Sequence, residues 1–539
     1  MQNLFNSTNL DQTSSPEDLG IDSSLIKNFI SDCEKCNYNF KNIIIGRHGK
    51  IATRIVRKPF DPSFTHTSFS SAKPIVALAI GFAVCEGILR LDTTIEELFG
   101  DKLSDKEIKK IKGITVEHLL TMTAGKSVSL LFNKEKDDWF DTFINSKVIG
   151  KPGEKFKYVS ENTYMLGRIL SEVTGLTVSE YLRPRLLEPL GIEKFYWETD
   201  KSGYEAGAWG MFWTVDDMAK IAQLFLNRGK WDGVQIVPVE WLDMMITPHI
   251  SGINTIYAMD KGFGYQTWPN YEGTFYRFEG LYGQYIFIYP QYDAFVVMQS
   301  GDIRQYDFFP IVEKYFPEAF KEERIEITSA QREDYNNFIE NISYPILKGG
   351  PRNFATEQAL NLNCYKMVKM AYSTMQSAAC SFVQAKKPGK MTNIVFNFKE
   401  NYAEMMWNEK SYGTNKMIIS LDSETRYSTI TLGQFESHVA AYGKWLPSGK
   451  LQVQVISIES PDIRTFVFKF TKKYVFVKAK VDSGLKDMVR FELFFMGFKN
   501  VPFVKIVSFL ADAVAKIILY PPFLMGKAKK NKISEENKS

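Results

Sequence analysis

A serine and a lysine three residues apart, Ser70 and Lys73, stand at the start of the apolar run 75–84. A run that is apolar on every side predicts a helix buried all round. Residues three apart share a helix face, so the Lys73 amine can reach the Ser70 hydroxyl. Burial lowers the pKa of a lysine, and a neutral amine can take the serine proton. The pair is therefore a candidate nucleophile and base; the alternative is that Ser70 only caps the helix.

A tyrosine supplies a third candidate group. Tyr158 precedes a helix that we predict from Ser160, as N-cap, to Gly175. The start of a helix carries partial positive charge. Together with a nearby ammonium, this field would favour the phenolate and make Tyr158 a proton carrier. The alternative is a tyrosine that only packs.

Two glycines, Gly280 and Gly283, stand at the start of a predicted strand. Glycine lets a ligand approach the backbone closely. An exposed N–H group there could stabilise the oxyanion that forms when a carbonyl is attacked. The alternative is an ordinary β-turn.

The periodicity of apolar residues predicts the helices and strands that must position these groups. Strands are predicted at both ends of the first 300 residues, with helices between them. The strands are 42–46, 50–56, 275–278, 285–289 and 294–299, and the helices include 22–36, 215–227 and 239–246, with mainly helical chain over 95–205. This order predicts an antiparallel sheet assembled from both ends, flanked by helices, with a helical subdomain inserted.

A second domain follows a charge-rich stretch near 317–335 and the breaker Lys348-Gly-Gly-Pro351. Beyond it, apolar residues alternate with polar ones, as in 394–398, 451–455 and 466–470, which predicts an antiparallel β-rich domain. We therefore expect an α+β protein. Its expected parts are a loose segment 1–17, a first domain 18–320, a linker 321–350, a β-rich accessory domain 351–500, and a helix with a basic tail over 501–539.

Composition and charge exclude several classes of function. A net charge of +4 over 539 residues, with no basic block before the tail, argues against nucleic-acid binding. The five scattered cysteines argue against a disulfide framework. Cys33 and Cys36 have the spacing of a redox or metal half-site, but no second cysteine or histidine pair accompanies them, so we expect them to pack in a helix. The five histidines show no metal-ligand spacing, and we expect neither metal nor cofactor. The first residues lack an apolar signal segment, which favours a cytoplasmic protein.

The segment 503–530 holds an amphipathic helix that we assign to docking rather than to contact with a membrane surface. The oligomeric state is not predicted.

The motifs also follow one another in a specific order. They are Ser70-x-x-Lys73, 86–92, 118–125, Pro152-Gly-Glu, Tyr158-x-Ser160, 175–182, 188–192, 214–220 and 229–233. Over about residues 16–305 this order resembles the serine β-lactamase-like hydrolases, which include class C β-lactamases, penicillin-binding carboxypeptidases and esterases. The Tyr-x-Ser and Gly-x-x-Gly-Gln variants are most similar to the branch that contains 6-aminohexanoate-dimer hydrolase. The resemblance implies a β-lactamase/transpeptidase-like fold for the first domain.

The resemblance also implies roles. Ser70 would be the nucleophile, Lys73 would hold its proton, and Tyr158 would protonate the leaving group and then activate water. The backbone N–H groups of Ser70 and Leu281 would form the oxyanion hole. Candidates for substrate contact are Ser160, Gly280, Tyr282, Gly283 and Gln284.

Two departures from the family pattern bear on the substrate and the geometry. The family's Lys-Thr-Gly is Phe278-Glu279-Gly280 here, which removes the lysine that holds a substrate carboxylate; Arg277 could partly replace it. Pro74 follows Lys73 and could move the start of the helix. We therefore expect a serine hydrolase that cleaves a small ester or amide through an acyl-serine. The alternatives are a penicillin-binding DD-carboxypeptidase or weak β-lactamase, and a catalytically silent binding protein of the same fold.

Overall fold

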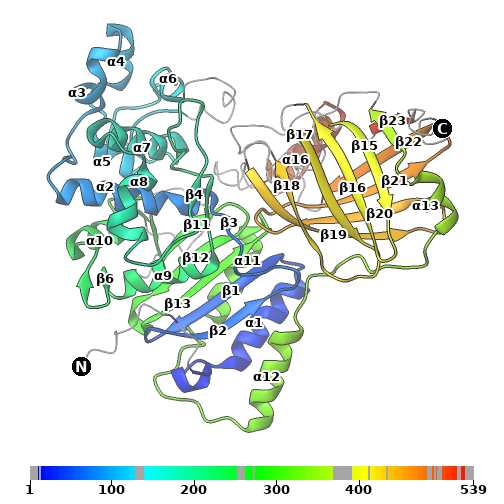
Figure 1. Ribbon diagram of the computed structural model, residues 1–539. Coiled ribbons are helices and arrows are strands. Elements are labelled where there is room, and N and C mark those ends of the chain that lie inside the picture. Colours follow the sequence, from blue (N-terminus) through cyan, green and yellow to red (C-terminus); the bar gives the residue numbers. More distant parts are fainter. Residues whose placement is uncertain are drawn as a thin grey trace. The chain divides into compact units, whose positions relative to one another are not determined.

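A computed structural model describes residues 14–127, 139–251, 262–270, 274–367, 391–410, 413–432, 435–481, 501–518 and 524–528, together with positions 10, 489, 490 and 493. The chain divides into two compact units (Figure 1). The N-terminal unit runs to Ile342, and the C-terminal unit begins at Ser343.

The N-terminal unit is built on one antiparallel sheet with the order β10-β11-β12-β13-β1-β2. Its strands are β1 (Phe40–Arg47), β2 (Lys50–Val56), β10 (Trp268–Pro269), β11 (Tyr276–Gly280), β12 (Gln284–Tyr289) and β13 (Ala294–Ser300). In the middle of the sheet, Ile44 of β1 lies opposite Val297 of β13 and Arg54 of β2. The expected sheet, assembled from both ends of the domain, is confirmed.

Helices cover both faces of this sheet, because successive residues of a strand point to opposite faces. On one face Phe287 packs against Phe309 of α11 (Gln305–Tyr315), beside α1 (Ser23–Lys35). On the other face Phe278 packs edge-on against Phe225 of α9 (Val215–Leu226), with the ring centroids 5.1 Å apart. The sheet is thus the middle layer of the unit.

The helical subdomain lies between β2 and β10 in the chain. Its principal helices are η2 (Phe69–Ala72), α2 (Lys73–Cys85), α5 (Val116–Leu120), α7 (Ser160–Thr174) and α10 (Val239–Ile246). Its shorter elements are α3 (Ile95–Phe99), η3 (Gly100–Lys102), α4 (Asp105–Ile111), α6 (Trp139–Ile144), α8 (Val178–Leu182), η5 (Arg183–Leu187), β3 (His66–Thr67), β4 (Tyr196–Trp197), β5 (Met211–Trp213), β6 (Lys230–Trp231), β7 (Val234–Gln235), β8 (Ile250–Ser251) and β9 (Gly262–Phe263). Outside the subdomain, η1 (Glu17–Leu19) precedes β1 and η6 (Pro290–Tyr292) joins β12 to β13. Every residue of α2 from Lys73 to Ala83 is buried, as its apolar run predicts.

The stretch 321–350, expected to be a linker, contains a packed helix. Helix α12 (Ser329–Asn341) buries Tyr335, whose hydroxyl hydrogen-bonds to Thr53 Oγ1 of β2 at 2.9 Å. Tyr335 and Ile342 belong to the same hydrophobic core as the sheet. Most of this stretch is therefore part of the N-terminal unit. Glu333, Asp334 and Glu340 are exposed on α12, whereas the charged run 321–326 precedes the helix.

The C-terminal unit is a β-barrel. Its sheet has the order β17-β16-β15-β14-β23-β22-β21-β20-β19-β18, and β17 also pairs with β19, which closes the sheet. The strands are β14 (Cys364–Met367), β15 (Met391–Phe398), β16 (Tyr402–Glu409), β17 (Gly413–Ser420), β18 (Tyr427–Leu432), β19 (Phe435–Trp445), β20 (Leu451–Ser457), β21 (Ile463–Phe470), β22 (Tyr474–Val481) and β23 (Leu524–Ala528). The alternating apolar residues form its core, so the expected antiparallel β-rich domain is confirmed.

Two helices belong to the C-terminal unit, α13 (Phe354–Leu360) and α16 (Val501–Ile518). Strand β23 follows α16 and lies between β14 and β22, within the stretch expected to be only a helix and a tail. Among the helices of the described residues, none is both long enough and apolar enough to cross a membrane.

Candidate active site

Ser70 and Lys73 meet through a 3₁₀ turn. Ser70 lies in η2, and the α-helix begins only at Lys73, not at Ser70 as the apolar run suggested. In a 3₁₀ helix residues three apart are eclipsed, so Lys73 is directly in line with Ser70. The Lys73 Nζ donates a hydrogen bond to Ser70 Oγ at 2.8 Å. Pro74 falls in the first turn of α2, where its missing N–H has no helix partner to lose, and it does not disturb this contact.

Lys73 is buried, with an exposed fraction of 1%. Its Nζ also donates to the carbonyl oxygen of Ala208 at 3.1 Å. Burial lowers the pKa of Lys73 to about 7, although the carboxylate of Glu161 acts in the opposite direction. Near neutral pH a large share of the amine is therefore uncharged and able to accept a proton.

Ala208, the second partner of Lys73, was not found from the sequence. It lies in a glycine-rich loop in which Gly207 has a φ of +65°. A Cβ on Gly207 would lie 3.1 Å from the carbonyl oxygen of Thr163 in α7, so glycine lets the loop approach that helix. The closely spaced glycines Gly207 and Gly210 are the feature of the sequence from which this loop could have been predicted.

Tyr158 lies beside Lys73, in the loop that leads into α7. The Lys73 Nζ is 4.8 Å from the centroid of the tyrosine ring. The ring stacks on Trp268, with centroids 5.8 Å apart and an interplanar angle of 26°, and meets the edge of Phe263. The structure thus brings the serine, the lysine and the tyrosine together from segments that are about ninety residues apart in the sequence.

Ser160 occupies a slightly different place from the one predicted. It is the first residue of α7, and the N-cap position belongs to Val159, which makes no side-chain cap. No hydrogen bond between Ser160 and Lys73 is present in the described part of the chain.

The turn that joins β11 to β12 lies against the backbone of Ser70. Gly280 ends β11, and a Cβ at this position would lie 2.2 Å from the Ser68 carbonyl oxygen and 3.1 Å from the Ser71 nitrogen. Only glycine permits this approach. The approach brings the segment that contains Leu281 beside the segment that contains Ser70.

Two bulky residues with left-handed backbone flank these segments. Phe69 has a φ of +47° and Tyr282 a φ of +62°. Such a conformation costs about 1–3 kcal/mol for a residue with a large side chain, and it persists only where the surroundings impose it. The two rings pack together with centroids 5.3 Å apart. The strained residue before the nucleophile and the strained residue of the turn thus support each other.

Gln284 fixes the turn from within. Its side chain is 1% exposed, and its Nε2 donates to the carbonyl oxygens of Tyr282 at 3.1 Å and Ser300 at 2.7 Å. Tyr282 is also 1% exposed. Both residues were candidates for substrate contact, and their buried side chains help to hold the turn.

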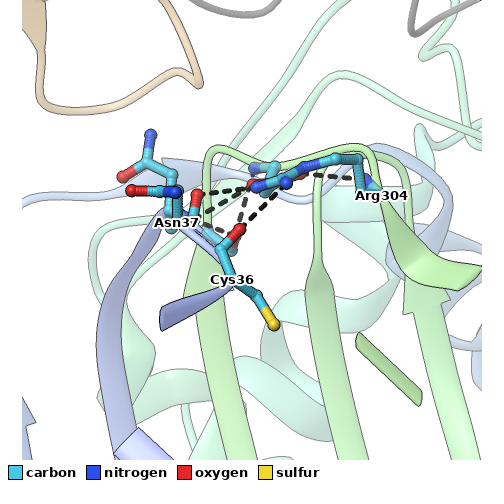
Figure 2. Close-up of polar contacts among 6 residues, drawn as sticks. Cys36, Asn37 and Arg304 are labelled. Carbon is cyan, nitrogen blue, oxygen red and sulfur yellow. Dashed lines mark hydrogen bonds and ion pairs between the residues drawn. The ribbon is translucent and has the colours of Figure 1, made fainter. Parts of the chain in front are cut away.

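A group of polar contacts in the neighbouring loops, which we call the polar clasp, supports the same turn; Figure 2 shows Arg304 of this group beside Cys36 and Asn37. Arg304 donates to the carbonyl oxygens of Cys36 at 3.0 Å and Asn37 at 2.6 Å, and it forms an ion pair with Asp302. The Asp302 backbone N–H donates to the Tyr282 carbonyl oxygen at 3.2 Å. The clasp therefore connects the end of α1, the loop after β13 and the turn that contains Leu281.

The position of the family's Lys-Thr-Gly carries a buried ion pair. Arg277 Nε donates to Glu279 Oε2 at 2.8 Å, and the exposed fractions of the two residues are 0% and 9%. The guanidinium also lies 4.9 Å from the ring centroid of Phe309, in the core. A buried guanidinium paired with a carboxylate presents no net positive charge, so the replacement of the family lysine by Arg277 is not supported.

The described residues contain no group of three or more histidine, cysteine or acidic side chains that could hold a metal ion. Cys33 and Cys36, which are close in sequence, are both free; Cys33 is buried in α1 and Cys36 is exposed.

This fold and site define a class of protein, an α+β hydrolase with a serine and a buried lysine in hydrogen-bond contact. Residues 42–302 match the beta-lactamase family model. Over this segment, a little under half of the chain, the N-terminal unit resembles the β-lactamase family, whose members are generally serine hydrolases.

Individual relatives were found among curated proteins and solved structures. The chain is 22% identical over 290 residues to the 6-aminohexanoate-dimer hydrolase of Paenarthrobacter ureafaciens. This alignment covers 48% of this chain and 71% of that protein. It is 30% identical over 133 residues to penicillin-binding protein 4 of Amycolatopsis lactamdurans, covering 24% of this chain and 34% of that protein. The structure of the octameric penicillin-binding protein homologue from Pyrococcus abyssi aligns with a TM-score of 0.45 at 18% identity, over 82% of this chain and 97% of that one.

The buried ion pair gives a prediction for stability. Arg277→Met should destabilise the protein by about 3–5 kcal/mol, because it leaves the Glu279 carboxylate buried without its partner. The double variant Arg277→Met/Glu279→Leu should recover most of this loss, since it removes both charges. Urea unfolding followed by tryptophan fluorescence measures the difference. Equal stability of the single variant and the unaltered protein would contradict the prediction.

Proposed function

We propose that this protein is a serine hydrolase that cleaves a small ester or amide through a covalent acyl-serine. The observation that carries the proposal is the 2.8 Å hydrogen bond between Lys73 Nζ and Ser70 Oγ, made by a lysine whose pKa is about 7. A serine activated in this way is a nucleophile at neutral pH.

In the proposed reaction Ser70 Oγ attacks the substrate carbonyl carbon, and its proton passes to the neutral Lys73 amine. The N–H groups of Ser70 and Leu281 donate to the oxyanion of the tetrahedral intermediate. Tyr158 then gives a proton to the leaving alcohol or amine, and the acyl-serine remains. A water molecule, deprotonated by Tyr158, attacks the acyl-serine and releases the acid, and the proton held by Lys73 returns to Ser70.

The surroundings of Tyr158 favour a neutral substrate with an apolar part. Met122, Phe263 and Trp268 form a hydrophobic cluster, against which Phe156 and Tyr158 pack. Because Arg277 is paired with Glu279, its charge does not stand in for the lysine that holds a carboxylate in the family. One matched relative is named for the hydrolysis of a 6-aminohexanoate dimer, which is an amide. These features favour an ester or amide over a β-lactam or a peptide terminus.

A fluorophosphonate probe tests the proposal directly. We expect it to label Ser70, as found by peptide mapping, and Ser70→Ala to abolish the labelling. Ser71→Ala is the matched control, because the Ser71 hydroxyl donates to the Ser68 carbonyl oxygen and should not react. The absence of labelling in the folded protein would favour the catalytically silent binding protein. Turnover of nitrocefin in place of p-nitrophenyl esters would favour the β-lactamase or carboxypeptidase alternative.

The pH dependence of labelling tests the role of Lys73. Its pKa is lowered from 10.5 to about 7, so the amine loses its proton as the pH rises through that value. Because the neutral amine is the base, the labelling rate should fall about tenfold for each pH unit below 7 and level off above it. Lys73→Arg should remove this inflection and slow the labelling, since arginine stays charged. An unchanged profile in that variant would exclude Lys73 as the base.

The proton transfer by Tyr158 gives a further prediction. Tyr158→Phe keeps the ring that stacks on Trp268 but removes the hydroxyl, so kcat on p-nitrophenyl esters and linear amides should fall by about 10²-fold or more. Tyr196→Phe, which alters an exposed tyrosine of β4, is the control and should be near normal. A near-normal kcat for Tyr158→Phe would remove Tyr158 from the mechanism.

A further inference from the structure

Along one side of the C-terminal barrel, the described strands carry lysines and no acidic residue. Six consecutive strands, in the order β15-β14-β23-β22-β21-β20, contain no aspartate or glutamate. Four of them carry exposed lysines. These are Lys366 of β14, Lys527 of β23, Lys478 and Lys480 of β22, and Lys469 of β21, which we call the lysine face. A large surface of one charge attracts an oppositely charged partner.

The pairing of the strands places two of these lysines directly opposite each other. Lys366 is the register partner of Lys527, and both are exposed. Like charges at opposite positions of neighbouring strands are destabilising. The turn that carries Lys472 and Lys473 lies beside them, because the Ala528 N–H donates to the Lys473 carbonyl oxygen at 2.8 Å. An anionic partner would relieve this repulsion.

Helix α16 of the same unit presents large apolar side chains to solvent. Phe503, Ile506, Phe509 and Leu510 have exposed fractions of 48%, 60%, 62% and 56%, and we call them the apolar stripe. Their spacing of three and four residues places them along one side of the helix. Val504 and Ser508, both 0% exposed, anchor the opposite side. A stripe of this kind on a protein surface marks an interaction site.

The lysine face and the helix are close in the chain. Five residues, 519–523, join the end of α16 to the start of β23. An extended chain spans at most about 3.6 Å per residue, so the end of α16 lies within about 22 Å of Leu524, the first residue of β23. The apolar stripe and the lysine face thus belong to one unit and are joined by a short stretch of chain.

Although the sequence alone favoured a docking helix over contact with a membrane surface, we propose that α16 and the lysine face dock the C-terminal unit onto an anionic lipid surface. An amphipathic helix that carries too many charged residues to cross a bilayer can lie in the headgroup region, with its apolar side chains inserted and lysines against acidic lipids. A soluble polyanion would neutralise the lysines but leave the apolar stripe in water. An apolar protein groove would cover the stripe but leave the lysines unused. A lipid surface offers both an apolar region and acidic headgroups.

Flotation of the full-length protein with lipid vesicles tests the proposal. The protein should bind vesicles that contain phosphatidylglycerol, bind phosphatidylcholine vesicles weakly, and dissociate as the salt concentration rises. Ile506→Glu/Leu510→Glu should weaken binding to the anionic vesicles at least about tenfold, and Lys366→Glu/Lys527→Glu should do the same. Thermal melting confirms that each variant is folded.

Val234→Glu is the matched control, because Val234 is 61% exposed on β7 of the N-terminal unit. It should bind vesicles like the unaltered protein. Equal binding to neutral and anionic vesicles would overturn the role of the lysine face. Absence of vesicle binding, or a dimer that Ile506→Glu/Leu510→Glu dissolves, would overturn the proposal and assign the stripe to a second copy of the chain. Labelling of Ser70 is a separate measurement, so this result does not depend on the proposed hydrolase activity.

Discussion

The structure of the site depends on one constraint, the burial of a lysine amine next to a serine hydroxyl. Lys73 is held by Ser70 Oγ and by the Ala208 carbonyl oxygen, and burial brings its pKa to about 7. A charged amine would be costly in this position. The apolar helix α2 therefore has two consequences: it packs the helical subdomain, and it keeps a proton acceptor available near neutral pH.

The second requirement is a rigid backbone around that pair. Phe69 and Tyr282 both adopt left-handed backbone, and a conformation of this kind persists only when its surroundings hold it. The Tyr282 carbonyl oxygen accepts hydrogen bonds from Gln284 Nε2 and from the Asp302 N–H, and Gly280 permits close approach to Ser68. The geometry around Ser70 therefore depends on the loops after α1 and β13 as well as on the turn between β11 and β12.

The two units differ in what the sequence revealed about them. In the N-terminal unit the motif order indicated the family, the sheet and the helical subdomain, since each motif lies at a fixed place in one fold. In the C-terminal unit alternation predicted strands and an antiparallel arrangement, but not the closure of β17 onto β19 or the insertion of β23. Strand order depends on pairing between distant segments, and alternation within one strand carries no information about its neighbour.

The sequence by itself supplied the candidate groups and the local elements: Ser70 and Lys73 from their type and spacing, Tyr158 from the motif order that resembles the family, and α2 from its apolar run. Only the tertiary structure decided the 3₁₀ turn that aligns Ser70 with Lys73, the Ala208 partner, and the pairing of Arg277 with Glu279. The reason is physical. Local propensity acts between near neighbours, whereas burial and hydrogen-bond partners are set by segments that meet only when the whole unit packs.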